Sequence, residues 1–360
     1  MKRLGILTGG GDAPGLNAVI RAAVKTAWLE YQCEVIGIED GYDGLLDEGR
    51  TRRLAPEDLH GLLPRGGTIL GTANRGNPFA RKVERAGQVV LEDVSPLIMS
   101  AVQRLEVDGL IVVGGDGTLR IAQELYQKFK LPVVGVPKTI DNDLNGTDVT
   151  FGFDTAVQTA TDACDKLHTT AESHHRVMLL ELMGRDAGFI TLHAGVAGGA
   201  DVILIPEIPF DIQVVCRKVM DRVETGRKFS VIAVAEGARP KDGEQFFWRA
   251  GDEVYVPRLG GISYKIGEII ERSTGMETRA TVLGHLQRGG RPSPFDRWLA
   301  TRFGAAVVRL AAAGGWGRMV GLEGEKIKDV LLEEAIAIPK RVDPHGEPVL
   351  TARGLGIVFG

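Results

Sequence analysis

The sequence is poor in cysteine and has no long apolar run. Its three cysteines, Cys33, Cys164 and Cys216, are far apart in the 360 residues, so no pair has the close spacing of a metal or redox motif, and we expect buried, reduced thiols. No apolar segment approaches the roughly 20 residues that span a bilayer. The glycine-rich start MKRLGILTGG is not typical of a signal peptide. We therefore expect a soluble, cytoplasmic protein that does not bind a membrane.

An excess of one charge is also missing. The 43 basic and 47 acidic residues are interspersed and leave a formal net charge of −4, so no electrostatic footprint suggests a nucleic acid or an anionic membrane as partner. Any bound anion must be held by local groups. Glycine, in contrast, is abundant, with 48 residues, which raises the question of where the backbone needs special conformations.

The order of short apolar runs and longer helical patterns predicts an α/β protein with largely parallel sheets covered by helices. The expected strands are Leu4–Leu7, Val35–Ile38, Leu110–Val113, Val133–Val136, Val177–Leu182, Val202–Ile205, Ser230–Val234 and Thr281–Leu283. The expected helices are Leu16–Glu30, Leu119–Phe129, Asp154–Thr170, Asp211–Thr225, Ile262–Ser273 and Asp296–Ala313. A chain of this length suits two lobes. Ligands of such sheets bind beyond the carboxyl ends of the strands, where loops lead into helices.

Two glycine-rich loops follow expected strands in this way. In TGGGDAPG, residues 8–15, the glycines let backbone N–H groups approach a phosphate, although a structural turn explains this loop equally well. GGDGT, residues 114–118, also enters a helix, whose positive end favours an anion. An acid beside a phosphate is repulsive unless a divalent cation lies between them, so Asp116 is interpreted as a Mg²⁺ ligand. The alternative is an N-cap aspartate in a tight turn.

A third polar loop interrupts an apolar run in GVPKTIDNDLNGT, residues 135–147. Asp141 and Asp143 are two residues apart, so both carboxylates would line one cleft if the segment is extended. One would act as general base toward a hydroxyl while the other positions metal or substrate. Lys138 and Thr139 are predicted to contact phosphate oxygens. The alternative for this loop by itself is a solvated Asx-rich turn.

Further polar residues stand at comparable breaks, although each alone is more often a surface charge. These residues are Arg176, Arg185 in MGRDAG, Glu236 in AEGA, Arg279, and His285 and Arg288 in GHLQRGG. His174 and His175 are adjacent and cannot share a helix face, which argues against a metal site there. Together the loops indicate transfer of a phosphoryl group to a hydroxyl of a small phosphorylated substrate. A dehydrogenase would need the spaced glycine fingerprint, which is missing, and a regulator without catalysis would not need Asp141.

The motifs TGGGDAPGLN, GGDGT, PKTIDND, MGR, AEG, ETRATVLGHLQRGG and TARGLGIVFG together resemble the 6-phosphofructokinase family, nearly end to end and in the family's order. The resemblance implies a glycolytic kinase that uses ATP and Mg²⁺ to phosphorylate the 1-hydroxyl of fructose 6-phosphate, giving fructose 1,6-bisphosphate. It implies two lobes with the active site in the cleft between them. Residues 1–152 plus about 287–338 would form the donor lobe, and residues 153–286 plus about 339–360 the fructose 6-phosphate lobe.

The resemblance also assigns residues. Asp141 is similar to the general base and Arg185 acts with it, while Asp116 is similar to the Mg²⁺ ligand. The implied donor site comprises Gly11, Arg75, Gly76, Gly115, Asp116, Gly117 and Thr118. The implied sugar-phosphate site comprises Thr139, Asp141, Arg176, Met183, Gly184, Arg185, Glu236, Arg279, His285 and Arg288. Arg176 and Arg279 resemble arginines that arrive from a neighbouring subunit, which implies a homo-oligomer, dimer or tetramer, with shared sites.

Two positions bear on the donor. Gly117 is typical of nucleotide-dependent members, whereas Lys138 is typical of pyrophosphate-dependent ones. An aspartate at 117 would meet the α-phosphate of a nucleotide, and glycine leaves room, so we expect ATP; a pyrophosphate-dependent enzyme is the alternative. The family's effector pocket is partly recognisable, since Arg21 and Arg227–Lys228 fit but His168 stands where an arginine is common. No effector is therefore predicted.

Overall fold

A computed structural model describes residues 1–47, 49–73, 76–85, 88–249 and 258–360. The chain divides into two compact units. Unit 1 comprises Met1–Thr139, Leu144–Asp154 and Arg288–Pro339, and unit 2 comprises Ile140–Asp143, Thr155–Gln287 and Lys340–Gly360. The segment Ile140–Asp143 groups with unit 2, whereas the sequence assigned it to the first lobe.

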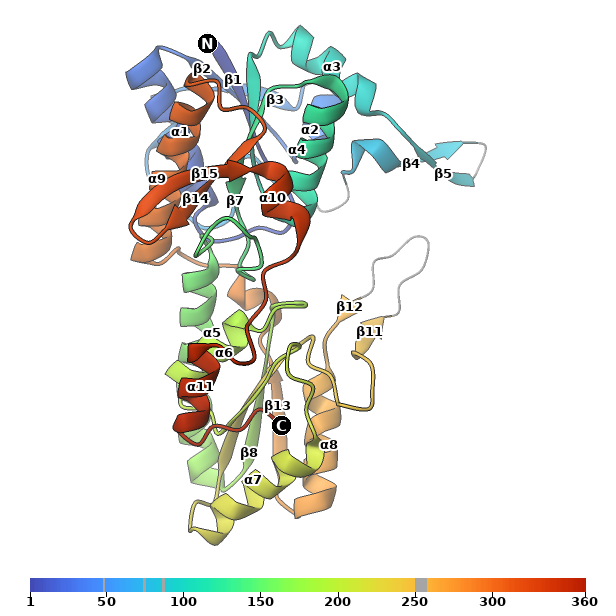
Figure 1. Ribbon diagram of the computed structural model, residues 1–360, viewed down its shortest axis with the longest axis vertical. Helices are drawn as coiled ribbons and strands as arrows, with labels where there is room; N and C mark the ends of the chain where they lie inside the picture. The colour runs from blue at the N-terminus through green and yellow to red at the C-terminus, as the bar shows by residue number, and fades with distance from the viewer. Residues whose placement is uncertain (48, 74–75, 86–87, 250–257) are drawn as a thin grey trace. The chain divides into compact units, whose positions relative to one another are not determined.

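Unit 1 is built on a seven-stranded sheet of order β15-β14-β7-β6-β1-β2-β3 (Figure 1). Its strands are β1 (Arg3–Thr8), β2 (Glu34–Ile38), β3 (Thr51–Leu54), β6 (Gly109–Gly114), β7 (Val133–Pro137), β14 (Arg318–Glu323) and β15 (Lys326–Leu331). The five inner strands run parallel, and the two edge strands, β3 and β15, are antiparallel to their neighbours. The largely parallel α/β sheet is as predicted, but the sequence missed β3, β14 and β15.

Helices cover both faces of this sheet. Leu110 and Val112 of β6 pack with the helices α3 (Ser95–Arg104), α4 (Asp116–Phe129) and α10 (Leu332–Ala337). The alternate residues of β6 pack with α1 (Leu16–Tyr31) and α9 (Pro294–Ala312). Because successive side chains of a strand point to opposite faces, an apolar run such as this one predicts burial on both sides. At Gly304 of α9 the close approach requires glycine, since a Cβ would lie 2.4 Å from the carbonyl oxygen of Val19.

Smaller elements complete unit 1. They are α2 (Asp43–Leu46), the 3₁₀ turns η1 (Pro56–Leu59) and η2 (Pro78–Ala80), and a hairpin of β4 (Arg81–Arg85) and β5 (Gln88–Glu92). The hairpin is antiparallel and separate from the main sheet. None of these elements was predicted, because each is too short or too polar to show a clear apolar period.

Unit 2 has a four-stranded, wholly parallel sheet of order β13-β8-β10-β9. The strands are β8 (Val177–Leu182), β9 (Val202–Leu204), β10 (Ser230–Ala235) and β13 (Thr278–Val282), and a separate pair is formed by β11 (Phe247–Arg249) and β12 (Arg258–Leu259). The helices are α5 (Phe153–His174), α6 (Phe189–Ala197), α7 (Ile212–Glu224), α8 (Ile262–Thr274) and α11 (Glu347–Gly354), and η3 (Gly284–Gln287) is a 3₁₀ turn. One face of the main sheet packs on α7 and α8, and the other on α6 and α11.

The predicted helices and strands are otherwise confirmed with shifted ends, but one strand was misplaced. The last strand of unit 2 begins at Thr278 and ends at Val282, not at Thr281–Leu283. It lies at the edge of its sheet with exposed side chains, so its apolar pattern is weak. Helices α3, α6, α10 and α11 and the strand pair β11–β12 were missed. The three cysteines are buried and free, as predicted.

Val342, in the proline-rich segment Pro339–Pro348, is 5% exposed and belongs to a core cluster with Ile205 and Val349. No helix in the described part of the chain combines the length and apolar character that crossing a membrane requires.

Candidate active site

Two predicted glycine loops and the first residues of the third polar loop meet at one edge of the unit 1 sheet. They follow β1, β6 and β7, which are neighbours in the order β7-β6-β1. The N–H of Gly9 donates to Val113 O (3.0 Å), and the N–H of Lys138 donates to Gly114 O (3.0 Å). Gly9 and Gly114 both pack against Thr118, because a Cβ on either would lie 2.7 or 2.4 Å from its side chain. The glycines therefore bring the loops together around the start of α4.

The start of α4 carries the acid singled out in GGDGT. Gly115 is the N-cap without a side-chain cap bond, and Asp116 is the first helical residue, so the N-cap alternative for Asp116 is wrong. Asp116 accepts a hydrogen bond from Arg120 (2.8 Å), and its side chain is 43% exposed. Behind it, the buried hydroxyl of Tyr42 donates to Thr118 O (3.1 Å). Burial raises the pKa of Tyr42, which keeps this donor protonated.

Lys138 and Arg288 both lie at the first glycine loop. Lys138 is only 3% exposed, and its ammonium group donates to Gly11 O. Arg288 packs on Gly11 and donates to Asp12 O (3.0 Å). Contact of Lys138 with a phosphate stays a prediction. Its bond to Gly11 O also holds the loop that follows β1. Arg288 was grouped by sequence with the sugar-phosphate residues and lies in unit 1.

The loop of the predicted base is not extended. Asn142 has φ +55°, in the left-handed region, so the condition of an extended segment, under which Asp141 and Asp143 would line one cleft, is not met. Asparagine tolerates this conformation better than most residues. On one side the loop is anchored by Thr139 O, which accepts from Thr150 Oγ1 (2.8 Å). On the other side Asp143 O accepts from the N–H of Lys340 (2.8 Å).

A second group of loops follows the strands of unit 2. The N–H of Met183 donates to Gln287 Oε1 (2.9 Å), and the N–H of Arg185 donates to Glu236 Oε1 (3.1 Å). Gly184 and Arg185 have φ +148° and +51°. A non-glycine residue held in the left-handed region is a strained feature that concentrates at functional sites. The turn leaves the Arg185 side chain 68% exposed, and His285 is also exposed.

Gln287 is a residue that sequence reasoning missed. It is fully buried and directly precedes Arg288 in GHLQRGG, and its side-chain oxygen fixes the backbone of Met183. A buried polar side chain needs such a partner, because an unmade hydrogen bond costs about 1–3 kcal/mol. Its place between the two noted polar residues of the motif, His285 and Arg288, was the available signal.

Arg176 and Arg279 do not lie with these loops. Arg176 precedes β8, and Arg279 pairs with Met178 near the start of β13, so both stand at the amino ends of the strands. The six residues of β8 separate the two edges by roughly 20 Å at about 3.3 Å per residue. Glu277 bonds Arg176 (2.7 Å) and Arg279. The hydrogen bond from Arg176 lowers the pKa of Glu277, so one carboxylate holds both guanidinium groups.

The remaining predicted positions concern the donor and the metal. Arg75 lies outside the described residues. Gly76 faces the carboxylate of Asp43, because a Cβ built on Gly76 would lie 3.1 Å from the Asp43 oxygens. In the described ranges no three His, Cys, Asp or Glu side chains are grouped as a protein-built metal cage would need. Mg²⁺ is usually held instead by one or two carboxylates together with phosphates and water. Asp116, half-exposed at a helix start, fits that mode.

A family model described as Phosphofructokinase matches residues 3–311. The chain belongs to the phosphofructokinase family. An "ATP-dependent 6-phosphofructokinase" of Chloroflexus aggregans is 56% identical over 361 residues, covering 100% of this chain and 98% of the relative. A "Pyrophosphate--fructose 6-phosphate 1-phosphotransferase" of Streptomyces coelicolor is 49% identical, covering 95% of this chain and 96% of the relative.

Solved phosphofructokinases have the same fold. The crystal structure of Pichia pastoris phosphofructokinase in the T-state matches with a TM-score of 0.79 and 32% identity, covering 93% of this chain and 35% of the Pichia chain. The resemblance drawn from the motifs is thus confirmed at the level of the family and of the α/β fold. All the predicted site residues fall within the matched range of the phosphofructokinase model.

Proposed function

We propose that this protein is an ATP-dependent 6-phosphofructokinase, which transfers the terminal phosphoryl group of ATP to the 1-hydroxyl of fructose 6-phosphate. The observation that carries the proposal is the meeting of two glycine loops and the first residues of a third polar loop at one sheet edge of unit 1, around the start of α4. The name of the Chloroflexus relative supports ATP as donor. Such an enzyme acts in glycolysis, in the cytoplasm.

The donor would bind at the start of α4. Backbone N–H groups of Gly115, Gly117 and Thr118 and the positive end of the helix suit phosphate oxygens. A Cβ on Gly117 would meet nothing within 4 Å, so there is room for a nucleotide's inner phosphate. Asp116 would hold Mg²⁺, which when bound neutralises charge on the transferred phosphate.

The acceptor would bind at the loops of unit 2. Arg185 is exposed and positively charged, and the Met183–Arg185 turn is fixed from both sides by hydrogen bonds. Asp141 would take the proton of the 1-hydroxyl while the sugar oxygen bonds to phosphorus and the bond from phosphorus to the leaving ADP oxygen breaks. Positioning and charge stabilisation supply most of the acceleration in phosphoryl transfer.

A direct assay tests this proposal. Purified protein is given fructose 6-phosphate and Mg²⁺ with either ATP or pyrophosphate, and fructose 1,6-bisphosphate is measured. We expect ATP to give a kcat/KM at least tenfold higher than pyrophosphate. Lack of fructose 1,6-bisphosphate formation with both donors would reject the function.

The second candidate is a pyrophosphate-dependent fructose 6-phosphate 1-phosphotransferase. Lys138 favours it, and the Streptomyces relative bears that name. Against it, Gly117 leaves the nucleotide's space open. The same assay separates the two, because the better donor is read directly.

We infer further that Arg176 and Arg279 act in the site of a neighbouring subunit, so the enzyme is a homo-oligomer. Their place at the amino ends of the strands supports this, since the loops of their own chain lie at the other ends. Arg176→Ala should raise KM for fructose 6-phosphate about 10- to 100-fold, because hydrogen bonds to charged groups contribute about 1.5–3 kcal/mol. Arg217→Ala, at an exposed arginine of α7, is the matched control.

Mixing subunits tests the sharing. If a site takes Asp141 from one subunit and Arg176 from another, every mixed pair of an Asp141→Asn chain and an Arg176→Ala chain contains one intact site and one site that lacks both residues. We expect such hybrids to recover activity at low fructose 6-phosphate concentration beyond the sum of the two parents. Hybrids demonstrated by native mass spectrometry without any recovery would show that each site is built from one chain.

A further inference from the structure

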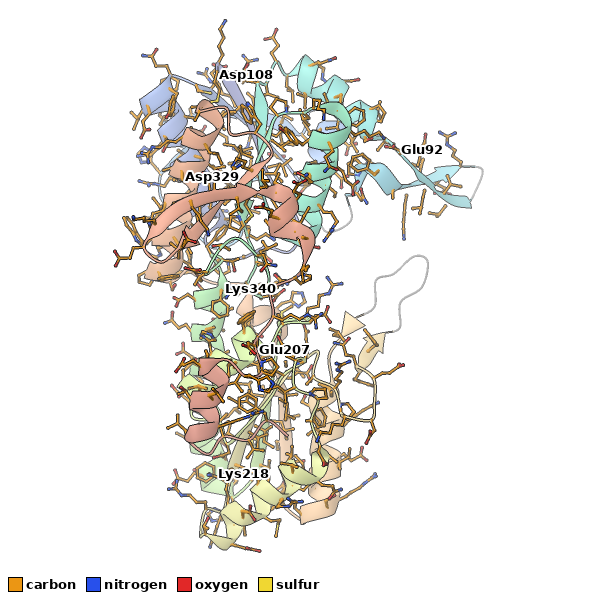
Figure 2. All side chains as sticks on the ribbon, viewed as in Figure 1. Glu92, Asp108, Glu207, Lys218, Asp329 and Lys340 are labelled. Carbon is orange, nitrogen blue, oxygen red and sulfur yellow. The ribbon has the colours of Figure 1, made fainter. Side chains whose placement is uncertain are left out.

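Glu207 lies in the loop that follows β9 of the unit 2 sheet and was not singled out by the sequence. It follows β9 by three residues and is partly buried. Both its carboxylate oxygens accept from the N–H of Gly188, at 3.0 and 3.1 Å, and Oε1 also accepts from the N–H of Val342 at 2.9 Å. One side chain thus joins two segments that are more than 150 residues apart in sequence. Figure 2 labels Glu207 and Lys340, which belongs to the second segment.

The first of these segments ends the turn that carries Arg185. Gly188 is the N-cap of α6, and the N–H of Ala187 closes the turn onto Gly184 O (2.9 Å). A carboxylate at a helix start is stabilised by the helix dipole. Glycine is required here, because a Cβ on Gly188 would lie 2.5 Å from Cβ of Ile205 and 2.8 Å from the Glu207 carboxylate.

The second segment, Lys340–Val342, leads to the loop of the base. The N–H of Lys340 donates to Asp143 O (2.8 Å), two residues beyond Asp141. The Lys340 ammonium lies 5.4 Å from the centre of the Phe189 ring, at the first residue of α6. Val342 is 5% exposed, which fixes the end of the segment in the core. The segment therefore contacts both the base loop and the start of α6.

We propose that Glu207 is a positioning residue, which through Lys340–Val342 and Gly188 holds the base loop Ile140–Asp143 and the turn Met183–Gly188 at a fixed spacing. The catalytic meaning rests on the proposed function, in which Asp141 deprotonates the sugar hydroxyl and Arg185 contacts the bound sugar phosphate. Misplacement of a reacting group by about 1 Å can cost on the order of 100-fold in rate. A single carboxylate that sets this spacing therefore acts on kcat without touching the substrate.

The decisive variant is Glu207→Gln. It keeps the size of the side chain but leaves one acceptor oxygen for the N–H groups of Gly188 and Val342, and its amide N–H₂ group would face the N–H of Gly188, where two donors repel each other. Glu207→Asp keeps the charge but shortens the reach, and serves if the glutamine variant does not fold. Glu347→Gln is the matched control, since Glu347 is exposed on α11 and bonds only Thr351 in the described hydrogen-bond network. Amide hydrogen exchange resolved to single residues is measured together with kcat, KM and the melting temperature.

We expect Glu207→Gln to speed exchange at Gly188, at Val342 and also at Lys340, and to lower kcat about 10- to 100-fold with a change in KM of at most a few-fold. Glu207→Asp should lie between this variant and the wild type, and Glu347→Gln should match the wild type. Exchange at the Lys340 amide separates coupling of the two loops from a local effect, because the acceptor of this amide is Asp143 O and not Glu207.

In Glu207→Gln, faster exchange only at Gly188 and Val342, while Lys340 keeps its wild-type protection, would show that Glu207 is a local helix cap. This result would overturn the proposal. An unchanged kcat per folded protein would overturn it as well. A wild-type protein that makes no fructose 1,6-bisphosphate would reject the proposed function instead, and the exchange at Lys340 would still report whether the two loops are coupled.

Discussion

Asp141→Asn is expected to lower kcat for fructose 6-phosphate by two to four orders of magnitude and to leave KM for both substrates within about threefold. General bases contribute about 10²- to 10⁴-fold in rate, and asparagine keeps the shape of the side chain but cannot take a proton. Asp141 is partly buried between Ile140, which is 0% exposed, and Asn142, which is 4% exposed. Its direction is thus set by a loop that the substitution does not alter.

Kinetics and thermal unfolding are measured on the same preparations. Asp221→Asn, at an exposed aspartate of α7, should behave like the wild type in both. Asp141→Asn should keep its melting temperature within a few degrees, so that the loss is in the chemical step. If the variant retains more than about a tenth of the wild-type kcat, Asp141 is not the base.

The donor loops could be predicted from the sequence because each follows an apolar run that parallel pairing buries on both faces. What the sequence did not contain was the strand order β7-β6-β1, which makes the starts of the three loops neighbours. The rule that ligands bind beyond the carboxyl ends of strands predicted at which edge of the sheet the donor would bind, and it did not need the strand order. The same rule would have singled out Glu207, which follows β9 as Glu236 follows β10.

Residues that act through other residues were harder to predict. Gln287 and Glu207 bind backbone N–H groups of turns that are distant in sequence, and no local pattern indicates such a bond. The left-handed Asn142 was not predicted either, and it turns the chain where the sequence left both an extended segment and an Asx-rich turn open. The edge strands β3 and β15 pair antiparallel with their neighbours and show no continuous apolar run, which is the signal that the prediction used.

Glycine at position 117 is expected to decide the donor, so that Gly117→Asp loses 100-fold or more in kcat/KM for ATP. A Cβ there meets nothing within 4 Å and the backbone is helical, so the aspartate fits the fold. An acid in the first turn of a helix is mildly stabilising, and the melting temperature should not fall. The loss therefore comes from the ligand, since like charges a few ångströms apart cost about 1 kcal/mol in water and about 4 kcal/mol at an effective dielectric of about 20.

Three further variants separate the effect of a charge at position 117, the effect of bulk at position 117 and the effect of the Lys138 side chain. Gly117→Asn has the bulk without the charge and should lose about tenfold less than Gly117→Asp, while Gly117→Ala should stay close to the wild type. Lys138→Met keeps the buried volume of Lys138 but removes its bond to Gly11 O, so it should weaken ATP binding without changing the preferred donor.

Both donors are titrated against every variant at fixed Mg²⁺. The ratio of kcat/KM for pyrophosphate to kcat/KM for ATP should be higher in Gly117→Asp than in the wild type, because Lys138 remains to bind a terminal phosphate. A wild type that turns over faster with pyrophosphate would mean that Lys138 outweighs the open space at Gly117, and the steric argument for ATP would then be wrong.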